Sequence, residues 1–190
     1  MTDAFVTPKP LFGRPILVNA TGSDAGLDFA GRHSDIVFIT SPAGSDIESA
    51  LASLPAYTVR VKQSAITHGR SVRTLLNPLV ICRDTEREAQ DYADAILAHA
   101  DTATMQGFAN ADSDAHAWRY RKDGRNRSIG GAIDGNVQII GSPEQVVDHF
   151  VRLHRAGVDG LQVAFYDFEP DLAFFGAHVL PLMRQAGLRL

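Results

Sequence analysis

The sequence predicts an α/β fold built on parallel β-strands. Short apolar runs alternate with segments of helical pattern along the chain, which is the order of repeated βα units. The runs are apolar throughout and do not alternate with polar residues, which is typical of strands buried on both faces of a parallel sheet. Of the 190 residues, 45% are hydrophobic, which is enough for one sizeable core. We therefore expect a single domain over residues 1–190.

The first βα unit follows an extended lead-in and occupies residues 15–33. The apolar run at 16–18 is too short for a helix and precedes a Gly/Ser turn, so we predict a buried strand there. Ser23 or Asp24 suits the N-cap of a helix that continues to about Arg32. The inner face of this helix is expected to comprise Leu27, Ala30 and Gly31.

The second strand is predicted at residues 35–40. A helical region follows over 45–68, interrupted or kinked near Pro55. The apolar stretch 73–83 predicts a third strand. Pro78 within it indicates a bulge or a strand end, because proline has no N–H for the ladder.

A helix capped by Asp84 or Thr85 is predicted to run to about Ala100. The next segment, at about 101–135, is rich in Asp, Asn, Gly and Arg and is interpreted as an irregular excursion. A short apolar piece follows at 137–140.

The clearest helix in the sequence begins after Ser142, because Ser142 and Gln145 have the spacing of a capping box. Gly157 ends it. The last strand is predicted over 160–168 and the final helix over 170–186. The apolar face of the capped helix is expected to comprise Val146, Val147, Phe150, Leu153 and His154.

Composition excludes several classes of protein. The net charge of −4 offers no basic surface for nucleic acid or membrane. Cys82 is the only cysteine, so no internal disulfide forms, and its apolar surroundings predict a buried, inert thiol. No Cys/His spacing indicates a metal site. No apolar run approaches the ~20 residues that span a bilayer, and the start of the chain lacks signal-peptide features, so we expect a cytoplasmic protein.

The turn Thr21-Gly22-Ser23 lies where the first strand passes into the first helix. A helix N-terminus offers unpaired N–H groups, Gly22 lets backbone approach a phosphate, and Ser23 adds a hydroxyl donor. Gly26 is expected to keep that side of the helix bare. The G-x-G-x-x-G dinucleotide fingerprint is absent. A plain N-capped turn and a phosphate-binding turn both fit this pattern.

Four stretches, taken in their order and spacing, carry a resemblance to a known family: RPILVNATGSDAGLDFAGRHSDIVFI, PLVICRDTEREAQDYA, IIGSPEQVVDHFVRLHRAGVDGLQVAF and FGAHVLPLMRQAGL. The chain resembles the C-terminal half of the bacterial luciferase-like, flavin-dependent monooxygenases. The resemblance implies the last four strands of a TIM (β/α)8 barrel. The segments 19–23 and 157–160 are most similar to the branch that contains pyrimidine, dimethyl-sulfone, dibenzothiophene-sulfone and aminopolycarboxylate monooxygenases.

The same resemblance implies a cofactor and a site. Members use reduced FMN, supplied by a separate flavin reductase, with O2 and a small organic substrate such as a sulfone or a heterocycle. It implies that the FMN phosphate binds at Ala20, Thr21, Gly22 and Ser23. Asn77 is a candidate substrate-binding residue, with a satisfied core amide as the alternative. No residue is assigned as catalytic, and no metal is expected.

The sequence leaves two functions open. In the first, the chain is an FMN-dependent monooxygenase that is complete only as a homo-oligomer or with an N-terminal half. In the second, it is a non-catalytic, flavin- or partner-binding half-barrel from a truncated or split gene. The resemblance by itself does not decide whether the chain alone is an enzyme.

The remaining polar candidates have structural alternatives. Asp167 either lies at the active face of the barrel or caps the final helix. Trp118 and Tyr120 either cover a substrate pocket or belong to a loop. The histidines are expected to be solvated at helix ends or packed on helix faces: His33, His68, His149 and His154.

Overall fold

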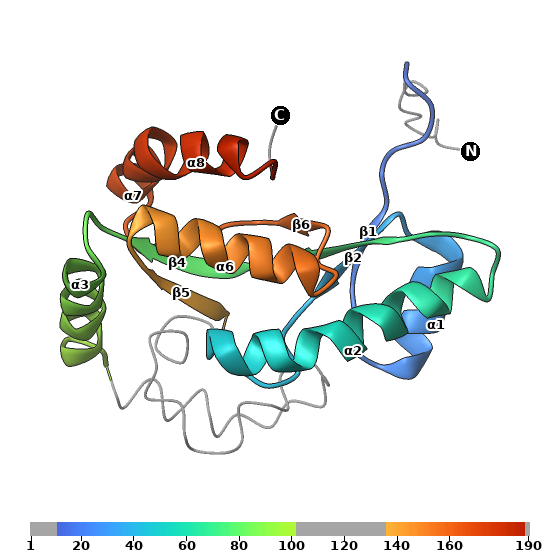
Figure 1. The fold of residues 1–190 in the computed structure, drawn as a ribbon. Coiled ribbons are helices and arrows are strands. Elements are labelled where there is room, and N and C mark those ends of the chain that lie inside the picture. The colour runs from blue at the N-terminus through green and yellow to red at the C-terminus, as the bar shows by residue number, and fades with distance from the viewer. Residues whose placement is uncertain (1–10, 102–135, 189–190) are drawn as a thin grey trace, which may run out of the picture.

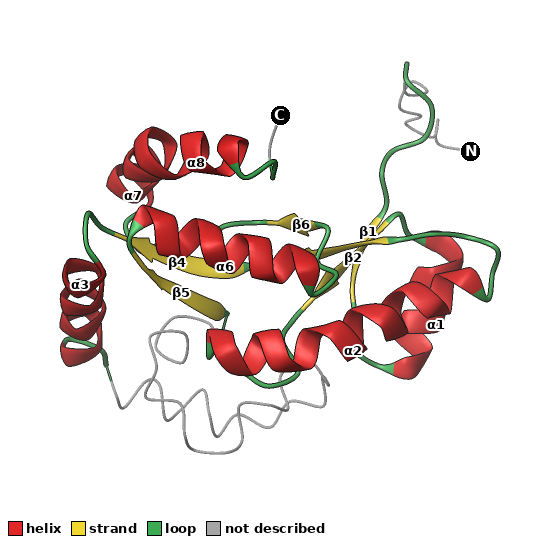
Figure 2. Ribbon diagram, viewed as in Figure 1, coloured by secondary structure: helices red, strands yellow, loops and turns green. Residues whose placement is uncertain are grey.

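The computed structural model describes residues 11–101 and 136–188, which form two parallel sheets with helices packed around them (Figure 1, Figure 2). The larger sheet has the strand order β1-β2-β3-β6, and the smaller one pairs β4 with β5. Because every strand pair in these ranges is parallel, the predicted α/β class is confirmed. Apart from Asp101, the predicted excursion with Trp118 and Tyr120 lies outside the described residues.

The larger sheet follows the order of the chain, so its outer strands are β1 and β6. Its strands are β1 (Val18–Ala20), β2 (Ile36–Ile39), β3 (Arg73–Leu76) and β6 (Gly160–Leu161). Because neighbouring strands are parallel, their carboxyl ends lie along one border of the sheet. The turn after β1 therefore lies at this border.

The predicted third strand is in fact two strands, β3 and β4 (Pro78–Cys82), separated at Asn77. Pro78 cannot donate to a ladder, so the β3 pairing stops before it. The chain then changes partner, because β4 pairs with β5 (Val137–Gly141). The predicted last strand is also shorter than 160–168: after β6 it continues only as an isolated bridge between Leu79 and Ala164.

Helices α1 (Asp24–His33) and α2 (Ile47–Ile66) pack closely against each other. A Cβ at Gly31 would lie 2.6 Å from the carbonyl oxygen of Ser64, so glycine allows this approach. Ser64 also donates its hydroxyl to the carbonyl of Leu27 at 3.1 Å. The predicted inner face of α1 is confirmed: Leu27, Ala30 and Gly31 are buried.

Helix α2 continues through Pro55, so of the predicted interruption or kink the interruption is wrong. A proline removes one helical hydrogen bond, but the rest of α2 is stabilised by a continuous buried face. This face comprises Ala50, Leu54, Thr58, Val61 and Ala65. Thr58 donates its hydroxyl to the Pro55 carbonyl at 3.1 Å.

Two predicted helix starts are confirmed, and both have a capping box, which was predicted at Ser142 but not at Thr85. Thr85 and Glu88 cap α3 (Glu86–Ala98), and Ser142 and Gln145 cap α6 (Pro143–Arg155). On α6, the predicted apolar face is buried except for His154, which is exposed. His154 follows Leu153 by one residue, and a one-residue step turns a helix by about 100° away from the buried face.

The predicted final helix consists of three consecutive segments: α7 (Phe168–Phe174), the π-helical turn η2 (Phe175–Val179) and α8 (Leu180–Gln185). The π turn ends just before Pro181 on α8, and a wide turn accommodates the missing N–H and the ring of a proline. These segments lie over α6, as Figure 1 shows.

The core lies between the sheets and the helices, and includes Leu54, Leu76, Ile139, Phe150 and Leu153. A smaller cluster joins β4 to α3 through Leu79, Ile81, Ala89 and Ala93. Within residues 11–101 and 136–188, no helix has the length and apolarity needed to cross a membrane.

Candidate functional site

The turn after β1 is an N-capped strand-to-helix corner, as predicted. The Ser23 hydroxyl accepts a hydrogen bond from the Gly26 N–H at 3.1 Å, and the Ser23 carbonyl accepts one from Leu27 at 2.8 Å. A serine hydroxyl that accepts a bond still has its own hydrogen to donate. The corner therefore presents one hydroxyl donor beside the first N–H groups of α1.

Gly22 leaves open space at this corner. A Cβ added there would meet only the Tyr57 hydroxyl, at 3.9 Å, which is ordinary van der Waals contact. Nothing in the described fold therefore requires glycine at this position for packing. The backbone of Gly22 is accessible to a small anion, and any side chain at this position would take up that space.

Gly26 has a different role from the one predicted. A Cβ at Gly26 would lie 1.7 Å from the Thr21 hydroxyl oxygen, so the Thr21 side chain occupies the space beside this glycine. The side of the helix that the sequence analysis expects to be bare is filled by Thr21. Thr21 and Gly26 thus fix the shape of the corner from within.

The charges around the corner are balanced. Asp24, the first residue of α1, forms an ion pair with Arg60 of α2. A free carboxylate here would repel an anion at the helix start, so the Arg60 guanidinium keeps the corner compatible with a phosphate. The α1 dipole then directs its positive end at the Gly22–Ser23 turn.

The other end of α1 is held by a second cluster. His68 contacts Asp28 at 2.8 Å, and Arg32 contacts the same carboxylate at 2.9 Å. The hydrogen bond from His68 lowers the pKa of Asp28 below its usual value. His68 is therefore an Asp28 partner and not simply solvated at a helix end, whereas His33 packs against the ring of Phe29.

Asn77 lies at the break between β3 and β4, and its amide oxygen is buried without a hydrogen-bond partner. The amide nitrogen of Gln138 on β5 is buried in the same unpaired state. Gln138 is in register with Leu79, two residues after Asn77. Buried unpaired polar atoms are uncommon in folded proteins, so these two amides are candidates for ligand contacts.

Gln138 was not predicted from the sequence. The only signal was one polar residue inside the apolar piece at 137–140. The β4–β5 pairing that brings it near Asn77 joins residues about sixty positions apart, so local patterns do not show it.

An ion pair between a partly exposed arginine and a buried aspartate at the end of β4 was also missed. Arg83 donates to Asp171 at 2.9 Å and lies over the Tyr92 ring at 3.9 Å. Asp171 also accepts a hydrogen bond from the Asp167 N–H at 3.1 Å, which fixes the start of α7. Asp167 occupies the N-cap position of α7, but its side chain makes no capping bond there.

Two further predictions are borne out by the structure. Cys82 is buried, and burial raises the pKa of its thiol to about 12, so it remains protonated and inert. His149 packs on α6, where burial lowers its pKa. No group of His, Cys, Asp and Glu in the described residues has a metal-binding arrangement.

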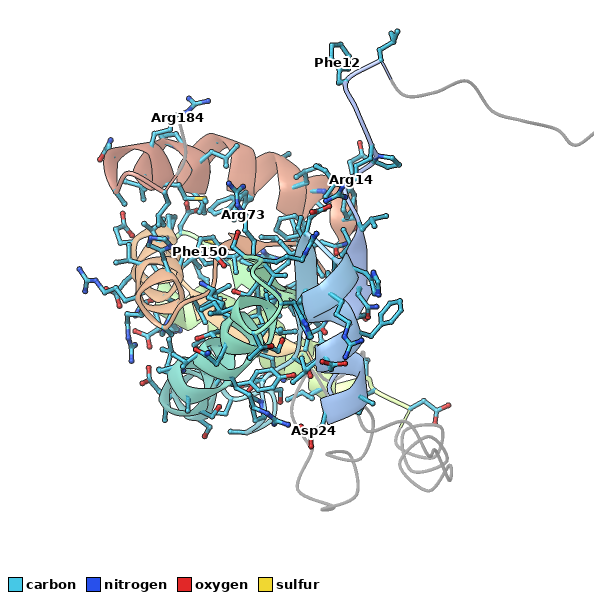
Figure 3. The ribbon with its side chains drawn as sticks, turned by 90° about the vertical axis from the view of Figure 1, so that its right-hand side faces the viewer. Phe12, Arg14, Asp24, Arg73, Phe150 and Arg184 are labelled. Atoms are coloured by element: carbon cyan, nitrogen blue, oxygen red, sulfur yellow. The ribbon has the colours of Figure 1, made fainter. Side chains whose placement is uncertain are left out.

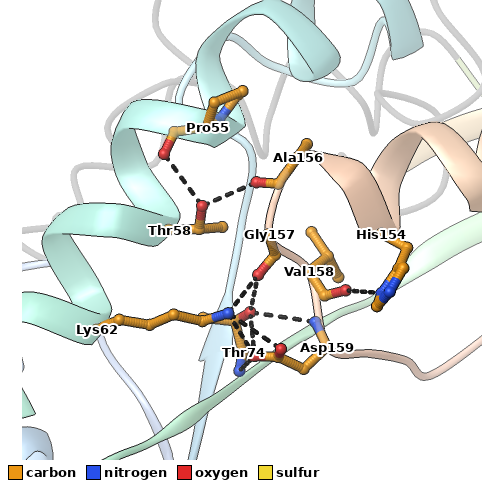
Figure 4. A network of polar contacts seen from close by, with 9 residues as sticks. All are labelled: Pro55, Thr58, Lys62, Thr74, His154, Ala156, Gly157, Val158 and Asp159. Carbon is orange, nitrogen blue, oxygen red and sulfur yellow. Dashed lines mark hydrogen bonds and ion pairs between the residues drawn. The ribbon is translucent and has the colours of Figure 1, made fainter.

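A network at the amino ends of β3 and β6 holds α2 to the sheet (Figure 4). Asp159 accepts bonds from the Lys62 ammonium at 3.0 Å and from the Thr74 N–H at 2.8 Å. Thr58 donates to the Ala156 carbonyl at 2.8 Å, and a Cβ at Gly157 would lie 2.5 Å from that hydroxyl. This network lies at the end of the strands opposite the Gly22–Ser23 corner, where its role is stability.

Comparison with known proteins identifies the class. The Luciferase-like monooxygenase family profile matches residues 1–160. A dimethylsulfone monooxygenase of Pseudomonas fluorescens (strain Pf0-1), described as FMNH2-dependent, is 33% identical over 186 residues, covering 94% of this chain and 48% of that protein. Pyrimidine monooxygenase RutA of Klebsiella pneumoniae is 28% identical, covering 97% of this chain and 50% of that protein.

Solved structures share the fold. DmoA from Hyphomicrobium sulfonivorans superposes with a TM-score of 0.72 at 21% identity, covering 91% of this chain and 42% of that one. EDTA monooxygenase from Chelativorans sp. BNC1 superposes with a TM-score of 0.69 at 18% identity, covering 96% of this chain and 49% of that one.

The family assignment follows from the profile match over residues 1–160. The chain belongs to the luciferase-like monooxygenase family. It spans about half the length of the curated relatives it matches.

Proposed function

We propose that this chain is one half of an FMNH2-dependent monooxygenase that acts on a small organic substrate such as a sulfone or a heterocycle. The observation that carries the proposal is the open, N-capped corner at Gly22–Ser23, at the carboxyl border of a parallel sheet. Family membership and the FMNH2-dependent relatives support it.

The half in question is the C-terminal one. The order of the strands in the larger sheet is β1, β2, β3 and β6, which is also their order in the chain, where β4 and β5 of the smaller sheet come between β3 and β6. Four neighbouring barrel strands would have the same order. The resemblance of residues 14–188 to C-terminal family segments supports their assignment to the last four strands.

The corner has the features that a flavin phosphate needs. The backbone at Ala20, Thr21 and Gly22 and the hydroxyl of Ser23 would hold the phosphate, with the first N–H groups of α1 behind them. Gly22 has no side chain in the way, and Arg60 neutralises Asp24. These observations fit the phosphate of FMN better than a bare structural turn.

When bound, reduced FMN supplies the reaction with O2 and the transfer of one oxygen atom to the substrate. The residues of this chain bind and orient. The unpaired amide oxygen of Asn77 could accept a hydrogen bond from the substrate, and the amide nitrogen of Gln138 could donate one to it. The reduced flavin would come from a separate flavin reductase.

Water exclusion sets a condition on activity. A reactive flavin must be kept from water, and the walls that do so surround the whole mouth of a barrel. The described sheet has four strands and two open outer strands, so it encloses only part of such a mouth. We therefore propose that the active form contains the other half of the barrel, supplied by another copy of this chain or by an N-terminal half.

The second candidate function is a non-catalytic, flavin- or partner-binding half-barrel. The open outer strands favour it for the chain by itself. The two candidates differ in the fate of the O2 that FMNH2 would reduce. A monooxygenase would place one oxygen atom in the substrate and the other in water, with the two electrons taken from FMNH2, whereas an open flavin site would pass both electrons to O2 and release hydrogen peroxide.

The test measures oxygenated product and hydrogen peroxide together. The purified chain is supplied with FMNH2, O2 and dimethylsulfone or uracil, with and without the N-terminal half of a relative. Product formation in the assembled state supports the monooxygenase. Flavin binding with peroxide release in every state supports the alternative.

A further inference from the structure

One outer strand of the sheet exposes apolar side chains. Ile16 and Val18 of the β1 segment are 70% and 54% exposed. The Leu17 carbonyl accepts bonds from Asp35 and Ile36, so the backbone groups of Leu17 face β2. Successive residues of a strand direct their backbone groups to opposite sides, so those of Val18 face away from the sheet and are ready to pair with another strand.

An apolar arm precedes this strand. Phe12 is 99% exposed and extends away from the body of the protein in Figure 3, and Leu11, its neighbour in the chain, is 92% exposed. The base of the arm is fixed, because the Arg14 guanidinium makes two hydrogen bonds to Asp35, at 2.5 and 2.6 Å. The arm and β1 thus present exposed apolar side chains on both sides of Arg14, and no described part of this chain covers them.

The opposite outer strand borders an apolar cavity. Gln162 and Ala164 direct their N–H groups toward β3 and β4, so the backbone groups of Leu161 and Val163 face outward. Beside them lies a half-open cavity of about 360 Å³ between α6, the β6 segment and α8. Its apolar lining includes Phe150, Leu153, Leu161, Val163, Phe175 and Met183.

We propose that the partner is a second copy of this chain, whose β1 pairs with the β6 edge while its apolar arm and strand cover this cavity. This extends the proposed function by naming the chain that completes the site. The exposed apolar β1 edge and the apolar cavity lie at opposite edges of one sheet. The β1 edge of each copy can therefore cover the cavity of the other copy.

Geometry favours a closed pair. A two-fold axis along the strands keeps all strands parallel and joins β1 to β6 at both junctions, so no outer strand remains. Four strands from each copy give the eight of the family barrel. Pairing of β1 with β1 would be antiparallel and would leave the cavity open.

The test measures the mass of the full chain in solution without flavin, by sedimentation equilibrium and light scattering. We expect a dimer at micromolar concentration. Val18→Asp and Leu161→Lys should each raise the dimer dissociation constant at least about tenfold, because each places a charge in an apolar junction. Val59→Asp is the matched control, since Val59 is 66% exposed on α2, away from both edges.

Mixing the two variants is the decisive step. In a closed pair of Val18→Asp with Leu161→Lys, one junction holds an Asp opposite a Lys and the other junction is unchanged. The mixture should therefore form a dimer that neither variant forms alone. If Leu161→Lys loses its circular dichroism signal, Met183→Lys on α8 replaces it, because Met183 lines the same cavity.

Three results overturn the inference: a monomeric wild type, dissociation by Val18→Asp but by neither cavity variant, or failure of the mixture to dimerise. Dissociation by Val59→Asp would also contradict it. Because no flavin is present, these outcomes are separate from the test of the proposed function, which measures flavin binding and oxygenated product.

Discussion

At the residue scale, the neighbours Gly22 and Ser23 contribute differently to the corner. Ser23 caps α1 through the Gly26 N–H and has a hydrogen left to donate. Gly22 contributes only space, because a Cβ there would touch nothing closer than 3.9 Å. A cap and a space can be changed independently, so binding and stability are separable at this corner.

Changes at Ser23 exploit this separation. Ser23→Ala should lower the affinity for FMN and the free energy of unfolding, each by about 1–2 kcal/mol, through loss of the donor and of the cap. Ser23→Asp should keep the cap but repel the phosphate, so stability is retained and FMN binding is lost. Urea unfolding and flavin titration measure the two effects. Retained binding in Ser23→Asp would contradict a phosphate at this corner.

Asp159 gives a pH-dependent contribution to stability. Burial by itself raises its pKa, but hydrogen bonds from Lys62 and Thr74 outweigh burial, and the net pKa lies below the usual 3.8. A carboxylate with a lowered folded-state pKa stabilises the fold above its unfolded pKa, and this stabilisation is lost as the pH falls through the folded value.

We therefore expect the thermal midpoint of the wild type to fall as the pH drops below about 4. Asp159→Asn should be less stable at pH 7 and should show a smaller fall. Asp148→Asn, at an exposed position on α6, is the control and should behave as the wild type. If the thermal midpoint of Asp159→Asn fell with pH as much as that of the wild type, the Lys62–Asp159–Thr74 network would not be the cause of the fall.

The residues of the site differ in how well the sequence predicts them. Ser23 and Gly22 are local features, because a cap and a turn depend on a few consecutive residues. Gln138, Arg83 and Asp171 were not predicted, because each acquires its environment from a segment far away in the chain.

At the element scale, α1 and α2 are joined by a contact that only glycine permits. Gly31→Ala would place a Cβ 2.6 Å from the Ser64 carbonyl, so the helices must separate. We expect a loss of about 1–3 kcal/mol in the free energy of unfolding, the usual cost of overpacking. Gly176→Ala, where a Cβ meets nothing within 4 Å, is the control for urea unfolding. Equal stability of both variants would refute the close contact.

Elements with their own start signals were predicted well. The Ser142–Gln145 and Thr85–Glu88 boxes define α6 and α3, because capping depends on residues three apart. At Pro78 the sequence predicted a bulge or a strand end, and the structure has the strand end. The new partner of β4 was not predicted, because β5 lies beyond the excursion. The uninterrupted α2 reflects tertiary burial that outweighs a local proline preference.

At the scale of the whole molecule, an incomplete mouth predicts uncoupled chemistry. A chain kept monomeric by Val18→Asp should show little oxygenated product with FMNH2 and O2, and hydrogen peroxide should dominate, because water reaches the flavin. The assay compares product with peroxide for the variant and for Val59→Asp. Tightly coupled product formation by the monomer would show that the four-stranded half is an enzyme in its own right.

The measurement that tests the central claim most directly is an anaerobic titration of the chain with reduced FMN and with reduced riboflavin, which lacks the phosphate. We expect wild type and the Gly176→Val control to bind FMN at least about tenfold more tightly than riboflavin, as a charge-assisted phosphate site requires. Gly22→Val should remove this preference, because the valine side chain would occupy the space of the phosphate. It should leave the free energy of unfolding unchanged, because a Cβ at this position meets no protein atom closer than 3.9 Å. Equal affinities of the wild type for FMN and riboflavin, or an unchanged preference in Gly22→Val, would contradict the assignment of this corner to the flavin phosphate.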